Sequence, residues 1–240
     1  MPMELLANIA EARGLTLDTT QLGQFEVYYR LLVAANERVN LTSVTAYEEV
    51  QRRHFGESLA VAAALYRTGL LWPGRAARTI DVGAGAGFPG LPIKIAHPAL
   101  RLTLLESAAK KTAFLEGVVE RLALADVAVV TGRAESAAHE PAHREAYDLA
   151  LARAVASLPV LLELALPFLR LGGFLAAPKG SRAAQEVAAA AAALQACGGR
   201  ILVAERLPDS PLTLVLVEKV APTPSAYPRR PGIPAKRPLC

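Results

Sequence analysis

The 240-residue chain is poor in cysteine and has no long hydrophobic run. Cys197 and Cys240 are its two cysteines, and their spacing offers neither a disulfide framework nor a metal-binding CxxC pair. No stretch of about 18 uninterrupted apolar residues occurs, so we expect no transmembrane helix. The N-terminus lacks a basic segment followed by an apolar one, which argues against a secretory signal. These absences predict a cytoplasmic protein without a membrane association or a metal site.

Aromatic residues are also scarce, at 5% of the chain, although 52% of the residues are hydrophobic. Ala and Leu fill the apolar positions and favour helices. This hydrophobic fraction suffices for a buried core and excludes disorder of the whole chain. The net charge of +4 is too small to indicate a nucleic-acid partner by itself. Acidic residues are absent after Glu218, whereas the basic residues there are Lys219, Arg229, Arg230, Lys236 and Arg237.

The first region, residues 1–74, shows helical periodicity. It predicts a helix around residues 5–10, a longer helix that Asp18 opens, and a third helix that begins near Tyr47. The apolar face of the longer helix is expected to carry Leu22, Phe25, Val27, Tyr29, Leu32 and Val33. We interpret this region as a helical extension that precedes the main domain.

From residue 75 to 220, short apolar runs alternate with longer amphipathic ones. The expected strands are 78–82, 101–105, 127–131, 148–153, 173–177, 201–205 and 212–217, and the expected helices are 89–96, 107–122, 158–169 and 182–196. This alternation predicts an α/β domain with a mostly parallel seven-stranded sheet and helices on both faces. A tight turn joins the last two strands, so they must be antiparallel, because a parallel pair needs a long crossover.

The final segment, residues 221–240, contains six prolines. Proline lacks the backbone N–H that helix interiors and central strands require. The segment is therefore expected to form no helix and no central strand, and to be a basic extended arm or a flexible tail.

A glycine-rich loop follows the expected strand 78–82 and opens a helix. Glycine permits a tight turn and a close approach of the backbone to a ligand. Gly85, Gly87 and Gly90 satisfy the GxGxxG pattern that binds NAD. Alternatively, Asp81 with Gly83, Gly85 and Gly87 satisfies the acidic-x-GxGxG pattern of the S-adenosylmethionine methyltransferases. The acid and the closing antiparallel strand pair favour S-adenosylmethionine, because dinucleotide-binding sheets are normally parallel throughout.

Two acidic residues further along are candidates for contacts with adenosine. Glu106 follows the next expected strand, where a carboxylate accepts both ribose hydroxyls of NAD or of S-adenosylmethionine. Ala134 and Glu135 follow the third strand in a segment that resembles the one beside the adenine in methyltransferases. A plain strand–helix turn with surface carboxylates is the structural alternative for both places.

Several further motifs occur together with this loop: Asn40-Leu41-Thr42, the run from Arg53 to Ser58, Leu104-Leu105-Glu106-Ser107, Ala152-Arg153-Ala154, Pro178-Lys179-Gly180 and the tail YPRRPGIPAKRPL. From about residue 36 to its end, the chain resembles the glucose-inhibited division protein B family. Members of that family methylate N7 of a guanine in bacterial small-subunit (16S) ribosomal RNA. The resemblance implies a Rossmann-like class I methyltransferase fold, S-adenosylmethionine as cofactor, and ribosomal RNA or the assembling small subunit as partner.

The resemblance also implies roles for individual residues. The expected cofactor contacts are Gly83, Gly85, Gly87, Phe88, Glu106, Ser107, Ala134, Glu135 and Arg153. The guanidinium of Arg153 would hold the methionine carboxylate or a phosphate. Lys179 would contact a substrate phosphate or the guanine O6, and Tyr227 would stack on an exposed base. Phosphate contacts are expected from Arg229, Arg230, Lys236 and Arg237.

Guanine N7 carries a free lone pair at neutral pH, so methyl transfer to it needs alignment of the reactants and no general base. We therefore expect no single catalytic residue, and a structural or RNA-contacting role for His54. We also expect a monomer. Two other functions stay open at this point: an NAD-dependent oxidoreductase, and a non-catalytic RNA-binding protein on the same fold.

Overall fold

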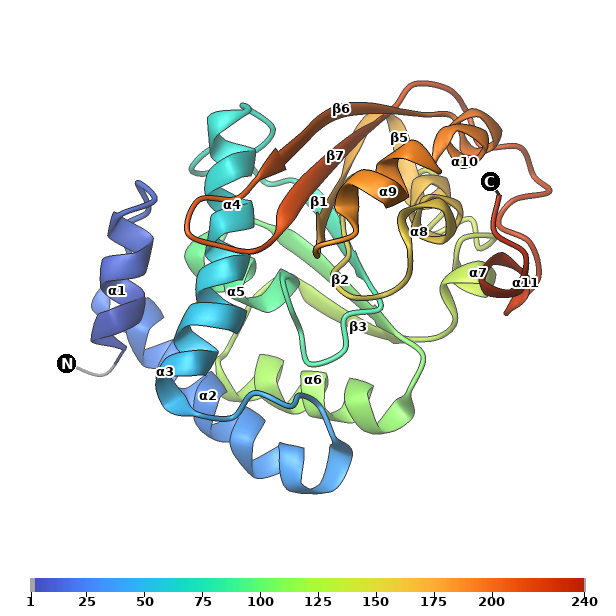
Figure 1. Cartoon of the computed structure of the whole chain (residues 1–240). Helices are drawn as coiled ribbons and strands as arrows, with labels where there is room; N and C mark the ends of the chain where they lie inside the picture. The colour runs from blue at the N-terminus through green and yellow to red at the C-terminus, as the bar shows by residue number, and fades with distance from the viewer. Residues whose placement is uncertain (1–2, 240) are drawn as a thin grey trace.

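The computed structural model describes residues 3–239, so Cys240 lies outside the described residues. Within this range, seven strands form one sheet in the order β3-β2-β1-β4-β5-β7-β6 (Figure 1). The strands are β1 Arg78–Val82, β2 Arg101–Glu106, β3 Val127–Thr131, β4 Tyr147–Leu151, β5 Leu169–Lys179, β6 Gly199–Arg206 and β7 Thr213–Lys219. β1 to β5 pair in parallel, whereas β7 runs antiparallel to both β5 and β6. The predicted sheet, including its antiparallel final pair, is confirmed.

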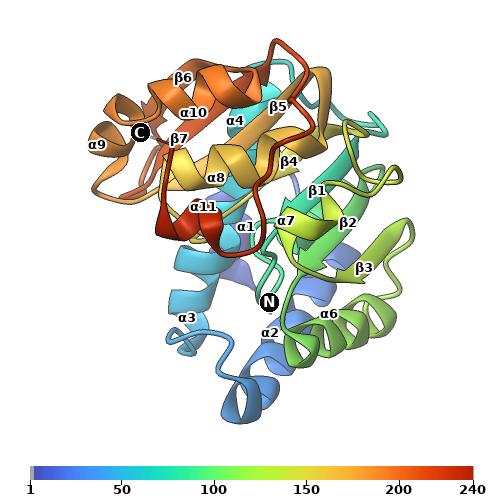
Figure 2. The same cartoon turned by 90° about the vertical axis from the view of Figure 1, so that its right-hand side faces the viewer.

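Helices cover both faces of the sheet (Figures 1 and 2). On one face lie α1 Glu4–Glu11, α2 Thr19–Val39, α3 Tyr47–Val50, α4 Glu57–Arg67, α5 Gly90–Ala96 and α6 Ala109–Arg121. On the other lie α7 Ala134–Ala137, α8 Leu158–Ala165, α9 Ala183–Ala188, α10 Ala191–Cys197 and α11 Ile233–Lys236. Alternate residues of one strand enter opposite cores: Leu149 and Leu151 of β4 face the first layer, and Ala150 faces the second. The N-terminal helices thus share one core with the sheet.

The longer N-terminal helix, α2, begins with a capping box in which the Asp18 side chain accepts from the Gln21 backbone N–H. Its buried positions are Leu22, Phe25, Tyr28 and Leu32. Val27 and Tyr29, expected on this apolar face, are half-buried and pack against the same core, and Val33 is half-buried as well. The fully buried Tyr28, which the sequence analysis did not include, lies between α2 and the glycine loop.

The third expected helix contains a π-helical segment, Gln51–Gly56, between α3 and α4. Such insertions are rare and often lie at functional sites. Gly56 closes this segment, and a Cβ there would lie only 2.9 Å from the Gln51 carbonyl oxygen. His54 of this segment and Glu57, which begins α4, both contact Arg153 just after β4.

Most boundaries differ from the expected ones by a few residues, and three differences change an element or the place of a site residue. β4 ends at Leu151, so Arg153 lies in the loop after the strand. The helix expected over 158–169 stops at Ala165, because Pro167 in the following 3₁₀ turn cannot continue it, and β5 begins at Leu169. The helix expected over 182–196 is divided into α9 and α10 within a run of alanines.

Residues 221–239, called the arm below, run back past α8, place their short helix α11 near α7 and α8, and then turn toward α9 (Figure 2). The expectation that this segment forms no helix was wrong, since α11 is a short helix within it. Pro234 sits in its first turn, where no intrahelical donor is required. None of the helices within residues 3–239 has the length and apolar character needed to span a membrane.

Candidate active site

The glycine loop connects β1 to α5 at the carboxyl edge of the sheet. Gly83, Gly85 and Gly87 have φ angles of 71°, 59° and 95°, in the left-handed region. A Cβ at Gly87 would lie 2.5 Å from Leu91 Cδ1 and 2.6 Å from the Tyr28 hydroxyl oxygen. A Cβ at Gly85 would meet little more than the Gly83 carbonyl oxygen, at 3.8 Å. One side of the loop is therefore tightly packed, and the backbone at Gly85 is open to a ligand.

The N-terminal helices hold the packed side of this loop. The Tyr28 hydroxyl donates a hydrogen bond to the Ala86 carbonyl oxygen, and burial raises the pKa of Tyr28 well above its usual value. The Phe88 ring lies between Tyr28 and His54, with ring centroids 5.6 and 4.6 Å away. The loop conformation therefore depends on the N-terminal helices as well as on the sheet.

Asp81, near the end of β1, is fully buried beneath the loop. Its Oδ2 accepts from the Gly90 backbone N–H at 2.8 Å. Burial raises the pKa of Asp81 to about 7, although the Gly90 N–H and the nearby Arg153 lower it. Among the described residues, its other oxygen, Oδ1, has no hydrogen-bond partner.

Glu106 is the last residue of β2 and is nearly buried. Its Oε2 accepts from the Gly85 N–H at 3.0 Å, and its Oε1 accepts from the Ala108 N–H at 2.9 Å. The carboxylate thus joins the glycine loop to the start of α6. Each carboxylate oxygen already accepts one backbone hydrogen bond. The expected contact of this carboxylate with a ribose stays a prediction.

Arg153 lies in the loop after β4. Its Nη2 donates to His54 Nδ1 at 2.9 Å, and its Nη1 lies 3.4 Å from Glu57 Oε2. In the part of the chain that the structure describes, Nη1 has no hydrogen-bond partner although it is buried. Arg153 therefore retains a spare donor at the carboxyl edge of the sheet.

His54 is held between two polar partners. Its Nε2 lies 2.7 Å from the Thr42 hydroxyl oxygen, and its Nδ1 accepts from Arg153. Burial, together with the charge of Arg153, lowers the pKa of His54 to about 4. The imidazole is neutral near pH 7 and both nitrogens are engaged, which supports a structural role and not that of a general base.

Within the described residues, three adjoining cavities follow the carboxyl ends of β1, β2 and β4. The inner cavity has a volume of about 170 Å³, and its lining includes Leu105, Ser107, Ala134, Glu135 and Val160. The loop cavity has a volume of about 410 Å³, and its lining includes Gly85, Phe88, Glu106, Lys111 and Arg153. The basic cavity has a volume of about 560 Å³, and its lining includes Arg53, Arg153, Lys179, Arg182 and Glu186. Gly83 and Ser107 line both of the first two cavities, and Arg153 lines the second and third. Val155 lines all three, so they form one trough.

Most expected cofactor residues border this trough. Those lining the inner or the loop cavity are Gly83, Gly85, Phe88, Glu106, Ser107, Ala134, Glu135 and Arg153. Gly87 instead shapes the turn. Sequence reasoning missed Tyr28 and Thr42, which support the site from the N-terminal region, as well as Val155. Asn40-Leu41-Thr42 was recognised only as a motif, without a role in the site.

Glu135 has a different environment from the one expected. It is 3% exposed, and its carboxylate accepts from Arg133 at 2.8 Å and from the Gly232 N–H of the arm at 2.9 Å. Burial alone would raise the pKa of Glu135, but these hydrogen bonds lower it overall. The carboxylate is therefore not a free acceptor for a base.

The expected RNA-contacting residues are partly committed within the protein. Lys179 ends β5, where its Nζ donates to the Ala156 carbonyl oxygen at 2.6 Å and pairs with Glu186 at 2.7 Å. Arg229 binds the fully buried Glu163 through Nε and Nη2, which anchors the arm, and its expected phosphate contact stays a prediction. Tyr227 packs against the second core, whereas the exposed basic side chains of the arm are Arg230, Lys236 and Arg237.

The trough fits S-adenosylmethionine. Its inner end is largely apolar, and its middle carries bare loop backbone and the carboxylate of Glu106. An α-amino acid end requires an acceptor and a donor. Among the described residues, Arg153 Nη1 on the wall of the loop cavity is a buried donor without a hydrogen-bond partner, and Asp81 Oδ1, an acceptor without one, is buried beneath the glycine loop and does not line the trough.

The sheet order, the loop and this set of groups define a class I S-adenosylmethionine-dependent methyltransferase. The sequence model of one family, described as rRNA small subunit methyltransferase G, matches residues 21–210. The chain belongs to this family.

Relatives named ribosomal RNA small subunit methyltransferase G match over nearly the whole chain. The protein of Roseiflexus castenholzii is 50% identical, covering 99% of this chain and 100% of the relative. Those of Chloroflexus aggregans (98% and 97% covered) and Bacillus cereus (100% and 99% covered) are 45% and 41% identical. This relationship favours neither an NAD-dependent oxidoreductase nor a non-catalytic RNA-binding protein.

Solved structures share the fold at low sequence identity. A SAM dependent methyltransferase from Aquifex aeolicus superposes with a TM-score of 0.52 at 17% identity, covering 67% of this chain and 89% of that one. A putative sarcosine dimethylglycine methyltransferase from Galdieria sulphuraria gives 0.56 at 13% identity, covering 81% and 98%. The [4+2]-cyclase SpnF gives 0.55 at 16% identity, covering 85% and 97%. These likenesses show the fold alone, since one neighbour is a cyclase.

Proposed function

We propose that this protein transfers the methyl group of S-adenosylmethionine to N7 of a guanine in small-subunit ribosomal RNA. The observation that carries the proposal is the continuity of the loop cavity with the basic cavity through Arg153 and Val155. A substrate phosphate in the basic cavity meets Arg53 and Arg182, and its base can reach the cofactor trough. The names of the relatives indicate which RNA this is.

The polar groups of the trough suit a transfer without a general base. S-adenosylmethionine, when bound, supplies a methyl group that is already activated by its sulfonium. Guanine N7 has no proton to lose, so the transfer needs no base, and both ring nitrogens of His54 are engaged with Thr42 and Arg153. Arg153 and Glu106 instead hold and orient the cofactor, and alignment supplies the rate enhancement.

Several cofactor contacts follow from the lining of the trough. We assign the ribose to Glu106, the methionine end to Arg153, and the adenine to the inner cavity beside Ala134. Lys179 becomes available to a substrate phosphate or to the guanine O6 if the incoming RNA displaces its Glu186 partner. The exposed Arg230, Lys236 and Arg237 serve as additional phosphate contacts.

The partner is either ribosomal RNA or the assembling small subunit, and the protein acts as a cytoplasmic monomer. The three-part organisation into an N-terminal helical region (1–74), a cofactor-binding domain (75–220) and the arm is part of this proposal. Sedimentation of the purified protein tests the monomeric state.

Nucleoside analysis tests the reaction. Small-subunit ribosomal RNA is isolated from a strain that lacks the protein, from the parent, and from the mutant complemented with the gene. We expect 7-methylguanosine at one position to disappear in the mutant and return on complementation. An unchanged modification profile, or the loss of a different methylated nucleoside, would overturn the proposal.

A further inference from the structure

The arm borders the inner cavity. Pro234 and Ala235 of α11 line this cavity together with Ala134 and Val160. Pro234 is buried, and the backbone N–H of Gly232, just before α11, donates to the buried Glu135. The C-terminal segment of the chain therefore supplies one wall of the space assigned above to the adenine.

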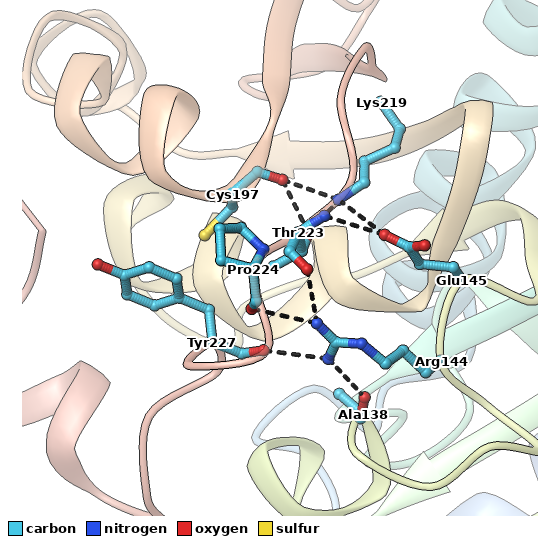
Figure 3. A network of polar contacts seen from close by, with 8 residues as sticks. All are labelled: Ala138, Arg144, Glu145, Cys197, Lys219, Thr223, Pro224 and Tyr227. Carbon is cyan, nitrogen blue, oxygen red and sulfur yellow. Dashed lines mark hydrogen bonds and ion pairs between the residues drawn. The ribbon is translucent and has the colours of Figure 1, made fainter.

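Arg144 anchors the first part of the arm. Its Nη1 donates to the carbonyl oxygens of Ala138 and Tyr227 at 3.1 Å each, and its Nη2 donates to those of Thr223 and Pro224 at 2.7 and 3.2 Å (Figure 3). One guanidinium thus satisfies three carbonyl groups of the arm and one near the end of α7. Because it binds backbone atoms of the arm, it fixes the path of the arm directly.

A second group of contacts surrounds Thr223 (Figure 3). The Thr223 N–H donates to Glu145 at 2.9 Å, and its hydroxyl donates to the Cys197 carbonyl oxygen at 2.9 Å. The buried Lys219 donates to the same carbonyl oxygen at 2.8 Å and to the Thr223 hydroxyl. The start of the arm is therefore attached both to α10 and to the loop before β4.

A buried ion pair anchors the middle of the arm. Glu163 of α8 is fully buried, and it accepts from the Arg229 backbone N–H at 2.8 Å and from Nε and Nη2 of the same residue at 2.9 and 2.6 Å. Breaking such a pair leaves a charge buried without a partner, so the contact is costly to lose. His139 adds a hydrogen bond to the Pro228 carbonyl oxygen at 2.8 Å.

We propose that the arm is the outer wall of the adenine site, and that Arg144, Glu163 and Glu135 are positioning residues that hold it against the cofactor. The inference rests on the proposed placement of adenine in the inner cavity. The same arm carries the exposed Lys236 and Arg237, so RNA bound to those charges lies next to the cofactor wall.

Substitution in the wall tests the proposal most specifically. Ala235→Leu adds bulk where the side chain lines the inner cavity, and Ala226→Leu places the same bulk at an exposed position of the arm that lines none of the three cavities described. By calorimetry, we expect Ala235→Leu to weaken binding of S-adenosylhomocysteine and of 5′-methylthioadenosine by about the same factor, on the order of tenfold or more. The two ligands share the adenosine and differ in the amino acid end. Ala226→Leu should bind both as the unaltered protein does.

Loosening the anchor provides a second test. Arg144→Ala removes the donor to the three arm carbonyls, whereas Arg200→Ala removes an exposed arginine whose Nη2 pairs with Glu218 of β7. We expect Arg144→Ala, but not Arg200→Ala, to lower the affinity for both ligands and to speed hydrogen exchange at residues 229–237. In the unaltered protein, S-adenosylhomocysteine should slow exchange in that segment.

The outcomes separate this inference from the function on which it depends. Full affinity of Ala235→Leu for both ligands, or no slowing of hydrogen exchange in the arm when ligand binds, would overturn the proposal that the arm forms a wall of the adenine site. Neither result would affect the methyltransferase assignment. Equal losses in Ala235→Leu and Ala226→Leu would also overturn it, because the effect would then not come from the cavity. An unaltered protein that binds neither ligand would overturn both the wall and the proposed cofactor placement.

Discussion

The Arg153 guanidinium donates a hydrogen bond from Nη2 to His54 Nδ1 at 2.9 Å. This contact joins the loop after β4 to the π-helical segment of the N-terminal region. Because its Nδ1 accepts a hydrogen bond from a cation, the imidazole carries its proton on Nε2, which donates a hydrogen bond to the Thr42 hydroxyl oxygen. His54 thereby orients Arg153 at the centre of the trough and loses the capacity to act as a base.

The pH dependence of the chemical step follows from this arrangement. With saturating cofactor and RNA, we expect the single-turnover rate of the unaltered protein to be flat from about pH 6 to 8.5. His54→Asn keeps an acceptor for Arg153, and its rate should fall by less than about tenfold. Loss of a general base typically costs about 10²–10⁴ in rate. A loss of that size, or an inflection near pH 6.5 that His54→Asn abolishes, would contradict the account.

Gly87 should tolerate no side chain. The Cβ of Gly87→Ala would lie within 2.6 Å of both Leu91 Cδ1 and the Tyr28 hydroxyl oxygen, at a φ of 95°. We expect a destabilisation of roughly 2–4 kcal/mol and loss of detectable cofactor binding. Gly117→Ala, in α6, is the matched control, because its Cβ meets no atom within 4 Å and alanine favours a helix. Denaturant unfolding measures the stability of both variants, and equal stabilities would refute the claim that the loop is tightly packed at Gly87.

Asp81 should make the stability of the ligand-free protein depend on pH. Burial raises its folded-state pKa to about 7, so the folded protein still binds the proton at pH values where the unfolded chain has released it. The stability from this group is fully present below about pH 4 and is lost as pH rises to about 7, at roughly 1.4 kcal/mol per unit of pKa shift. Asp81→Asn should therefore gain stability relative to the unaltered protein between pH 4 and 7. A difference that stays constant across this range would be evidence against the raised pKa.

Glu106 should contribute to cofactor affinity through its charge. Glu106→Ala removes the acceptor of the Gly85 and Ala108 N–H groups as well as the proposed ribose contact. We expect S-adenosylmethionine affinity to fall more than tenfold, on the order of 1.5–3 kcal/mol. Glu106→Gln retains an acceptor and should lose less. Glu120→Ala, an exposed carboxylate of α6, serves as control, and calorimetric affinities of Glu106→Ala equal to that control would reject the placement.

The sheet was predictable from the sequence because its signals are local. The runs at 78–82 and 127–131 begin and end where β1 and β3 do, since each is a short apolar run of strand formers bounded by turn residues. The tight connection before β7 predicted its antiparallel pairing for a geometric reason. The glycine loop and Glu106 were recognisable from their residue types and spacing, and the structure brings them together at the carboxyl edge of the sheet, while their contacts with a cofactor stay a prediction.

The contacts between distant segments were not predictable. Helical spacing could not decide between the adjacent Tyr28 and Tyr29, and only tertiary packing places the first under the loop. The break between α9 and α10 lies among alanines, which favour helix everywhere, so propensity gives no sign of it. The docking of the arm depends on Arg144 and Glu163, whose roles appear only when the fold brings them together.

Methyl transfer by the purified protein tests the central claim most directly. Small-subunit RNA and intact small subunits from a strain lacking the protein are incubated with labelled S-adenosylmethionine, and the modified RNA is cleaved chemically at 7-methylguanosine. With the unaltered protein, we predict that the RNA takes up label and is cleaved at a single guanine. With Gly87→Ala, we predict neither label nor cleavage. Transfer to another atom or to many positions, or no transfer to either substrate by a protein that binds the cofactor, would contradict the account.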